Sequence, residues 1–161
     1  MYKQKYKGTT YLGMDGKQQH TYQYDSNKHR LFTLPFRITT NNNKDIVVVD
    51  STSRDTGRVV VVGREGGLRW TYTGHSKINV TTQFKPFDVV TTAGHIIVCD
   101  LITHALHVLS GQGDILTCQV MEDMGIKYPF SLDFDMRGQL WVGCYTGGKQ
   151  SGAKIHILNL L

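Results

Sequence analysis

The acidic and histidine residues of this chain show few of the spacings that catalysis or metal binding requires. Asp133 and Asp135 flank Phe134 in a segment that alternates like a strand, so their carboxylates should share one face and could bind a cation or transfer protons. Such a pair more often lies on a solvated face or caps turn amides, and we favour that interpretation. His104 and His107 are three residues apart, but their side chains should diverge where a loop enters a strand. We therefore predict no metal site at either pair.

Motifs of the common catalytic centres are missing from the sequence. There is no Gly-x-Ser-x-Gly, no His-Glu-x-x-His and no phosphate-binding loop, and the segment 111–113 (GQG) lacks the third glycine and the helix of a nucleotide site. Asp50 and Asp100 follow two similar β-prone segments, and this repetition favours a structural role in which they accept loop N–H bonds. We predict no catalytic residue and no cofactor, so this chain is not expected to be an enzyme.

The dipeptide Pro-Phe opens three similar segments of the chain. They begin at Pro35, Pro86 and Pro129, which are the only prolines and lie 51 and then 43 residues apart. In each segment, apolar and polar residues then alternate, a turn of Gly, Asn or Asp follows, and a strongly β-prone tetrapeptide comes last. This period is typical of the four-stranded blades of a propeller, and helical periodicity is nearly absent. We therefore predict an all-β propeller fold with about three four-stranded blades in each chain.

Residue types assign four strands to each of the first two repeats. The expected strands are 37–40, 45–49, 58–62 and 68–72 in the first, and 88–91, 95–99, 105–109 and 115–120 in the second. A glycine-containing turn precedes the last strand of each, as a tight hairpin requires. The third repeat supplies strands 131–134, 139–143 and 154–158 but no outer strand. The predicted blades therefore span residues 35–73, 86–120 and 129–161.

The first segment of the chain suggests how such an arc could close. Residues 9–24 predict a hairpin, with strands at 9–14 and 18–24, of the kind that forms the outer half of a blade. Three blades are too few for a ring, because propellers hold about four to eight. We expect a two-fold homodimer in which each N-terminal hairpin completes the last blade of its partner, giving a six-bladed ring. The alternative is that this chain is a fragment of a six-bladed protein.

These features resemble a known family. Proline at the blade entry, the turn of Asn, Asp or Gly, the strand 46–50 and, in part, the strand 97–100 resemble the NHL repeat. The segment 22–35, and the ending 138–143 with 154–158, are similar to the C-terminal propellers of tripartite-motif (TRIM) proteins, most closely to the TRIM-like sets of bivalve molluscs. The resemblance covers about residues 9 to 161. It implies a propeller that selects a protein or RNA target, but no ubiquitin transfer, because the sequence lacks the Cys/His spacing of a RING or B-box.

Composition favours a globular, intracellular protein. The chain has 40% hydrophobic and 19% charged residues, no apolar run long enough to span a membrane, and no secretory signal after Met1. The three cysteines form no Cys-x-x-Cys pair, which favours a reduced, cytoplasmic setting without membrane attachment. The net charge of +5 points to an acidic partner, although the basic residues are spread along the chain.

Basic residues gather in the loops that a propeller presents around one end of its channel. The expected loops are 25–34, 73–85 and 121–128 between blades, and 51–57, 101–104 and 145–153 within them. The candidate ligand-binding residues on these loops are Lys28, His29, Arg30, Arg54, Lys77 and Lys149. Such a face would attract RNA phosphates or an acidic protein by long-range steering, and dimerisation would double it.

Three functions remain open at this stage. The first is a non-enzymatic, TRIM-like NHL module that binds a protein or RNA target. The second is a carbohydrate-binding, lectin-like propeller, which the many Tyr, Trp, Asn and Gly residues would suit and for which a glycan is the ligand. The third is an enzyme with a metal at the propeller centre. The sequence disfavours it, because His or carboxylate residues do not recur at equivalent positions of the repeats. Trp70 and Trp141 lie in predicted strands and should pack between blades.

Overall fold

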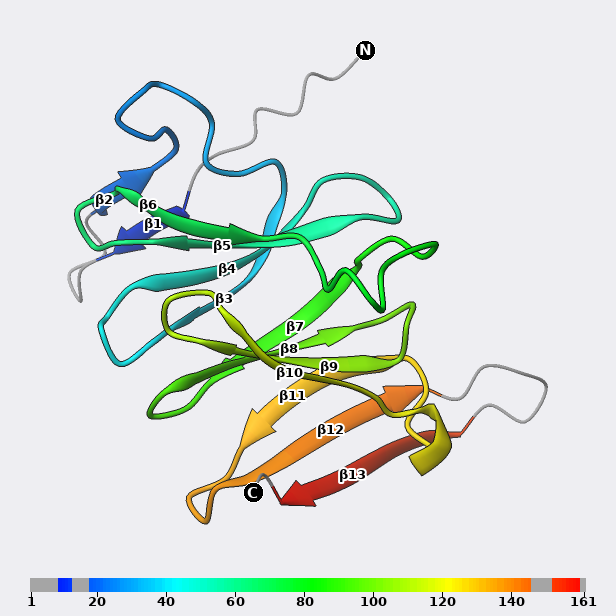
Figure 1. Ribbon diagram of the computed structural model, residues 1–161. Coiled ribbons are helices and arrows are strands. Elements are labelled where there is room, and N and C mark those ends of the chain that lie inside the picture. Colours follow the sequence, from blue (N-terminus) through cyan, green and yellow to red (C-terminus); the bar gives the residue numbers. More distant parts are fainter. Residues whose placement is uncertain (1–8, 13–17, 146–151, 160–161) are drawn as a thin grey trace.

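The computed structural model describes residues 9–12, 18–145 and 152–159, which form antiparallel strands and one short 3-10 helix (Figure 1). A small hairpin comes first, and three larger sheets, here named blades 1 to 3, follow in chain order. The hairpin consists of β1 (Thr9–Leu12) and β2 (Gln18–Tyr22). Blade 1 consists of β3 (Pro35–Thr40), β4 (Ile46–Ser51), β5 (Gly57–Val62) and β6 (Leu68–Tyr72). Blade 2 consists of β7 (Pro86–Thr91), β8 (His95–Asp100), β9 (Ala105–Ser110) and β10 (Ile115–Val120). The 3-10 helix Glu122–Met124 leads to blade 3, which consists of β11 (Pro129–Phe134), β12 (Gln139–Tyr145) and β13 (Ala153–Asn159).

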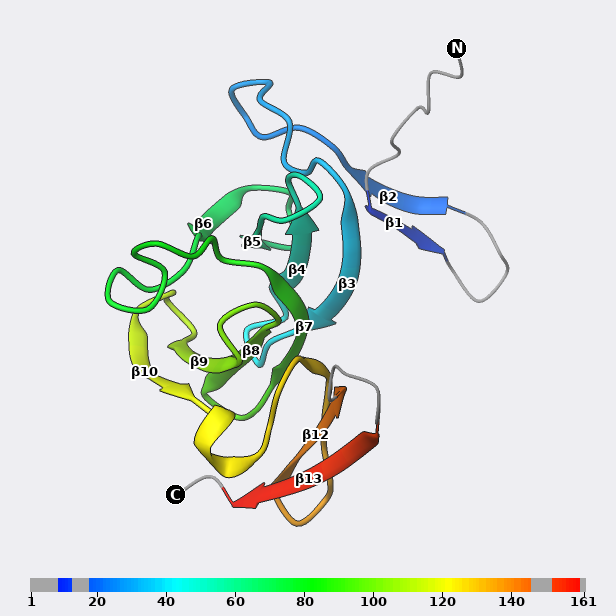
Figure 2. The same cartoon turned by 90° about the vertical axis from the view of Figure 1, so that its right-hand side faces the viewer.

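Each blade is a meander in which strands consecutive in sequence are neighbours in the sheet. The blades lie face to face and follow one another in an arc, from cyan through green to red in Figure 2. Loops that join one blade to the next lie at one end of the strands, together with the loops between the second and third strand of each blade (Figure 1). The tight hairpin turns lie at the other end. This is the arrangement of blades in a β-propeller, and it confirms the all-β, blade-like fold predicted from the repeats.

The three repeats share one pairing register. Pro35 pairs with Asp50, Pro86 with Asp100, and Pro129 with Cys144. A register shift follows each proline, so that the next pair involves the residue two positions later. The first strand of each blade therefore begins at the proline itself, two residues earlier than predicted, because the first residue of a strand need not donate to the ladder.

The core lies between the blades. Strands β4, β5, β8 and β9 are the central strands of blades 1 and 2, and β-branched residues dominate the first three of them. These residues are buried on both faces of the sheet, because a neighbouring layer covers each face. One cluster joins blade 1 to blade 2 and includes Val47, Val59, Val89 and Ile96; a second joins blade 2 to blade 3 and includes Ile97, Leu106, Leu132 and Leu140.

The N-terminal hairpin contacts the face of blade 1 that points away from blade 2. Tyr22 of β2 is buried there together with Leu31 and Phe32 of the following loop, over Ile46 and Val48. Its hydroxyl donates to the carbonyl oxygen of Arg64 at 2.5 Å. The hairpin forms as predicted, but β2 ends at Tyr22 rather than at residue 24, and residues 13–17, which include the predicted turn, lie outside the described residues.

Blade 3 differs from the other two in its strand number. Within the described residues it has three strands, and β13 pairs with β12 alone. One edge of β13, and the face of blade 3 that points away from blade 2, are therefore left without a neighbouring layer in Figures 1 and 2.

Candidate binding surface

A buried carboxylate organises the loops at the inter-blade end of blade 1. Asp50 is fully buried, and its Oδ1 accepts hydrogen bonds from the backbone N–H groups of Thr33 at 2.8 Å and Leu34 at 2.7 Å. Its Oδ2 accepts from Nε of Arg58 at 2.9 Å, and Nη2 of the same arginine donates to the carbonyl of Leu31 at 3.1 Å. The Asp50–Arg58 ion pair therefore connects the loop that precedes β3 to the start of β5.

Asp100 takes the same place in blade 2 with different partners. It is also fully buried, and it accepts from the backbone N–H groups of Lys85 and Ile102, the hydroxyl of Thr103 and the side-chain amide of Asn79. These four donors belong to the loop that enters the blade and to the loop between β8 and β9. The prediction that Asp50 and Asp100 accept loop N–H bonds is therefore confirmed.

The third repeat replaces this carboxylate with a thiol. Cys144 pairs with Pro129 in the register position of Asp50 and Asp100. The backbone N–H of Tyr128, the residue before the proline, donates instead to Nδ1 of His104 at 3.0 Å. The loop is therefore anchored to blade 2, from which the histidine comes.

The predicted basic candidates lie on these loops. Lys28, His29, Arg30, Arg54 and Lys77 are all exposed, whereas Lys149 lies outside the described residues. His29 is close to Asp25, with Nδ1 and Oδ2 3.3 Å apart. The other four cations form no ion pair with any residue in the described ranges. They remain available to a ligand.

Two further cations of the same face are partly neutralised. Nζ of Lys85 lies 3.6 Å from Asp55, and Nζ of Lys127 lies 2.7 Å from Glu122. The hydrogen bond that Lys127 donates to the carboxylate of Glu122 holds the pKa of Lys127 above its usual range. These two lysines add less to the positive potential than their number in the sequence suggests.

One member of the acidic pair of blade 3, Asp135, caps a turn. Oδ1 of Asp135 accepts from the N–H groups of Arg137 and Gln139 at 2.8 and 2.9 Å, and the N–H of Gln139 contributes most to lowering the pKa of this carboxyl. Oδ1 of Asp133 accepts from the next N–H in the chain, that of Phe134. The structural interpretation of the pair therefore holds at Asp135.

The two spaced histidines serve different elements. His107 is fully buried, its Nδ1 lies 2.8 Å from the hydroxyl of Tyr72, and its Nε2 lies 3.8 Å from Asp100. Burial lowers the pKa of His107 to about 4, although the charge of Asp100 opposes this shift. His104 instead accepts from Tyr128, so the side chains diverge as predicted. No group of three or more His, Cys, Asp or Glu residues within the described ranges could hold a metal ion.

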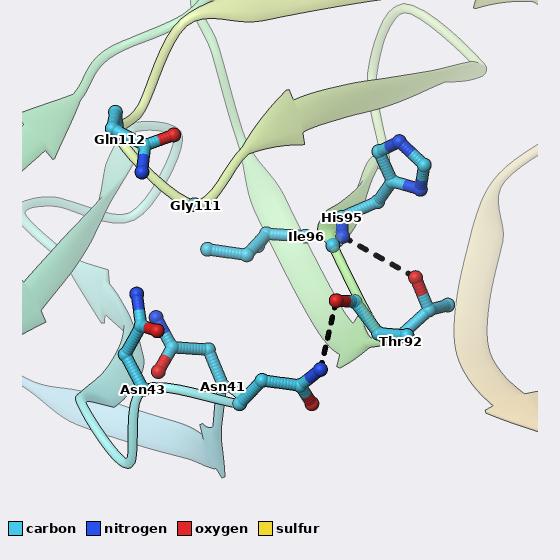
Figure 3. A pocket seen from close by; sticks show the side chains of 10 residues that line it. Asn41, Asn43, Thr92, His95, Ile96, Gly111 and Gln112 are labelled. Atoms are coloured by element: carbon cyan, nitrogen blue, oxygen red, sulfur yellow. Dashed lines mark hydrogen bonds between the residues drawn. The ribbon is translucent and has the colours of Figure 1, made fainter.

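A polar pocket lies at the opposite, hairpin end of blades 1 and 2. Its volume is about 240 Å³, and Figure 3 shows side chains from the β3–β4, β7–β8 and β9–β10 turns around it. The lining residues are Asn41, Asn42, Asn43, Thr92, Ala93, Gly94, His95, Ile96, Gly111 and Gln112. The amide of Asn42 donates to the carbonyl of Ala93 at 2.7 Å and so joins the two blades. The run of three asparagines at 41–43 is the feature of the sequence that could have indicated this pocket.

A second hollow of about 430 Å³ adjoins this pocket, since both are lined by Asn43, Gly111 and Gln112. Trp70 lines the second hollow, and its Nε1 donates to the carbonyl of Gly111 at 3.2 Å. Trp70 therefore packs between blades 1 and 2, as predicted. Trp141 does not pack between blades; it lies on the outer face of blade 3, where none of the described residues forms a further layer over it.

Comparison with known proteins identifies the fold class. No protein-family model and no curated protein matches the sequence. BamB from Moraxella catarrhalis is similar in structure, with a TM-score of 0.57 and 16% identity over 96% of this chain and 44% of that chain. Virginiamycin B lyase from Staphylococcus aureus gives a TM-score of 0.52 and 14% identity over 94% of this chain and 62% of that chain. Both are β-propeller-like proteins, so this chain has a propeller repeat fold and spans about half the length of these two structures.

Within the residues described, no helix has the length and apolar character that crossing a membrane demands.

Proposed function

We propose that this chain is a non-enzymatic recognition module, an NHL-type propeller half of the TRIM-like kind, that binds an acidic target through its basic loop face. The observation that carries this proposal is the set of four exposed cations, Lys28, Arg30, Arg54 and Lys77, that lie on the inter-blade and β4–β5 loops without an ion pair among the described residues. The target is a protein or an RNA. One of the two similar structures is named a lyase, so the fold alone does not separate binding from catalysis.

The loops that carry these cations are anchored, which suits them for recognition. Asp50 holds the loop that contains Arg30, and Asp100 is bonded to Asn79 in the loop that contains Lys77. Anchored loops lose little conformational freedom on binding, so more of the interaction energy appears as affinity. In a six-bladed ring of two copies, these cations would occur twice around one end of the channel.

A carbohydrate-binding propeller is the second candidate, and the pocket at the hairpin end favours it. Side-chain amides of Asn41, Asn43 and Gln112 line this pocket, with Trp70 in the adjoining hollow. Amides placed near an aromatic ring can hydrogen-bond hydroxyl groups and stack on an apolar sugar face. The two candidates use opposite ends of the blades, so one experiment can distinguish them.

The test measures binding of a single-stranded RNA and of an acidic peptide by fluorescence anisotropy over a series of salt concentrations. The loop variant carries Arg30→Gln, Arg54→Gln and Lys77→Gln. The control carries Lys44→Gln, Arg64→Gln and Arg137→Gln, which remove three exposed charges from the hairpin turns. We expect the loop variant to lose affinity and the salt slope to fall by about one for each phosphate contact removed, whereas the control binds like the original protein.

Equal loss in both variants would contradict the loop face as the binding site. Salt-insensitive binding that free sugars compete away, and that Asn43→Ala with Gln112→Ala abolishes, would replace the first proposal with the second.

A further inference from the structure

The three asparagines beside the pocket at the hairpin end of blades 1 and 2 differ in how they are bonded. Nδ2 of Asn41 donates to Oδ2 of Asp45 at 3.2 Å, and its Oδ1 accepts from the backbone N–H of Asp45 at 2.9 Å. The amide of Asn42 donates to the carbonyl of Ala93. The side chain of Asn43 forms no hydrogen bond with any residue in the described ranges, although it lines both the pocket and the adjoining hollow. Asn43 is therefore available to bond a ligand there.

A second available carboxamide comes from blade 2. Gln112 of the β9–β10 turn also lines both spaces, and only its backbone N–H is bonded to a described residue, the hydroxyl of Ser110. In Figure 3 the side chain of Gln112 comes from above and that of Asn43 from below, and Ile96 extends toward the space between them. The two amides therefore belong to opposite walls of one opening.

The floor of this pocket is apolar. Ile96 is 1% exposed, and its neighbours in the lining include Ala93 and Gly94, whose side chains also lack polar atoms. A Cβ at Gly94 would meet nothing within 4 Å, so there is room for a ligand on this side. A hydroxyl group placed over Ile96 would lose water without gaining a partner, whereas a methyl group would gain apolar contact. The pocket therefore favours a small apolar group flanked by atoms that bond to amides.

The adjoining hollow adds an aromatic wall. Trp70 lines it, and the indole is held in place because its Nε1 donates to the carbonyl of Gly111. The ring also packs over Gly113, where a Cβ would lie 2.6 Å from Cδ2 of Trp70. A fixed aromatic ring packs well against the apolar C–H face of a sugar ring, and it loses little freedom when it does so.

The charges around the hollow disfavour an anionic ligand. Arg69 lines the hollow, but its Nε lies 3.4 Å from Oδ1 of Asp45 and its Nη2 lies 2.9 Å from Oε1 of Glu65. Two carboxylates therefore neutralise this guanidinium. We expect a ligand without net charge, bonded through the amides rather than through an ion pair.

We infer that the pocket and the hollow together bind an N-acetylated amino sugar, a neutral pyranose that carries an acetamido group. Its methyl group lies over Ile96, its amide lies between Asn43 and Gln112, and its ring packs on Trp70. An amide complements two carboxamides because each partner both donates and accepts hydrogen bonds. A plain hexose lacks the methyl group that the apolar floor requires. This inference rests on the second candidate function above, the carbohydrate-binding propeller, and names the class of sugar.

The test measures the fluorescence of Trp70 in a Trp141→Phe background, because the chain has only two tryptophans. N-acetylglucosamine at millimolar concentration should change the emission of Trp70. Glucose differs from it only in the acetamido group and should bind about tenfold more weakly, as expected when one or two hydrogen bonds and a methyl contact are lost. Saturation-transfer NMR should show the strongest transfer to the acetyl methyl protons, since this group lies over Ile96.

Three variants locate the site. Gly111→Leu should abolish binding, because a Cβ there would meet only Nδ2 of Asn43, at 4.0 Å, and the longer side chain would fill the wall that the pocket and the hollow share. Asn43→Ala and Gln112→Ala should each weaken binding about threefold to tenfold. The matched control is Asn27→Ala with Gln119→Ala, which removes the same two side-chain types from exposed positions outside the lining. It should bind like the original protein.

Circular dichroism checks that each variant is folded. No binding of N-acetylglucosamine at millimolar concentration, equal binding of glucose, or full binding by folded Gly111→Leu would each overturn the inference. Equal binding of both sugars that Gly111→Leu abolishes would leave the carbohydrate-binding propeller intact and reject only the acetamido group. The loop variant Arg30→Gln, Arg54→Gln, Lys77→Gln should bind the amino sugar like the original protein, so a failure of the loop face and a failure of this site give different results.

Discussion

The hydroxyl of Tyr72 in β6 lies 2.8 Å from Nδ1 of His107 in β9, and this buried pair joins the outer strand of blade 1 to blade 2. Both side chains pack edge to face, with ring centroids 5.8 Å apart, and Phe84 completes the group. A polar pair in this position specifies one relative placement of the two blades, because its hydrogen bond is lost if either blade shifts.

Replacing Tyr72 with Phe should destabilise the protein by about 1–3 kcal/mol, because the buried imidazole of His107 loses its hydroxyl partner. Urea unfolding at a fixed protein concentration measures this change. Tyr24→Phe is the control, since Tyr24 is 46% exposed and its hydroxyl has water as an alternative partner. Equal stability of both variants would show that the Tyr72–His107 bond contributes nothing.

The stability of the fold should decrease as the pH is lowered from 6.5 to about 4, the interval between the unfolded and folded pKa values of His107. Burial lowers its pKa from 6.5 to about 4, with Asp100 opposing and the charge of His75 adding to the shift. Below pH 6.5 the unfolded chain binds a proton that the folded chain does not, so acid favours unfolding until the folded pKa is reached. The free energy of unfolding, measured from pH 7 to pH 4, should decline less steeply in His107→Phe. If the free energy of unfolding depends on pH as steeply in His107→Phe as in the original protein, groups other than His107 cause the decrease.

Gly113→Ala should be more damaging than Gly138→Ala. Both glycines have positive φ, at 91° and 79°, so both substitutions strain the backbone by about 1 kcal/mol. A Cβ at residue 113 would lie 2.6 Å from Cδ2 of Trp70, whereas a Cβ at residue 138 meets nothing within 4 Å. This clash should lower the free energy of unfolding of Gly113→Ala by about a further 1–3 kcal/mol, which thermal or urea unfolding can measure. Near-ultraviolet dichroism should also change in Gly113→Ala alone, because the Trp70 ring must move.

None of the three thiols should react like a free cysteine in the folded protein. Cys99 and Cys144 are buried, and burial raises the pKa values of Cys99 and Cys118 to about 12, so thiolate is scarce near neutral pH. Ellman's reagent should label the native protein slowly and should label all three cysteines in denaturant. One fast-reacting thiol under native conditions would contradict the packing around these sites.

Loss of the buried carboxylate in blade 1 should be costly. Asp50→Asn offers one acceptor oxygen in place of two, so either the two loop N–H groups or Arg58 lose their partner. We expect Asp50→Asn to lower the free energy of unfolding by about 1–3 kcal/mol. Asp133→Asn, whose carboxylate is exposed, should lower it by less than about 0.5 kcal/mol. Chemical denaturation compares the two, and equal values would mean that the loop is anchored by other contacts.

The amino-acid pattern was sufficient to predict the blades and their common register. Each Pro-Phe start, its turn and its β-branched strand lie within about 16 residues, so the hairpins form from local propensity and alternation. The structural role of Asp50 and Asp100 followed from the same repetition. The pattern does not distinguish a blade in the middle of the arc from one at its end, which is why Trp141 was expected to pack between blades.

The order of amino acids is enough to specify the strands, the turns and the apolar character of both faces of each sheet, because these depend on neighbours along the chain. Which of these faces are covered depends on how the blades pack against one another. The packing of the blades buries Val89 and leaves Ile38 exposed, pairs Lys85 with Asp55, and brings Asn42 to the carbonyl of Ala93. Contacts of this kind join residues up to about fifty positions apart, and they exist only once the blades are stacked, since the hydrophobic free energy of stacking selects the faces that meet.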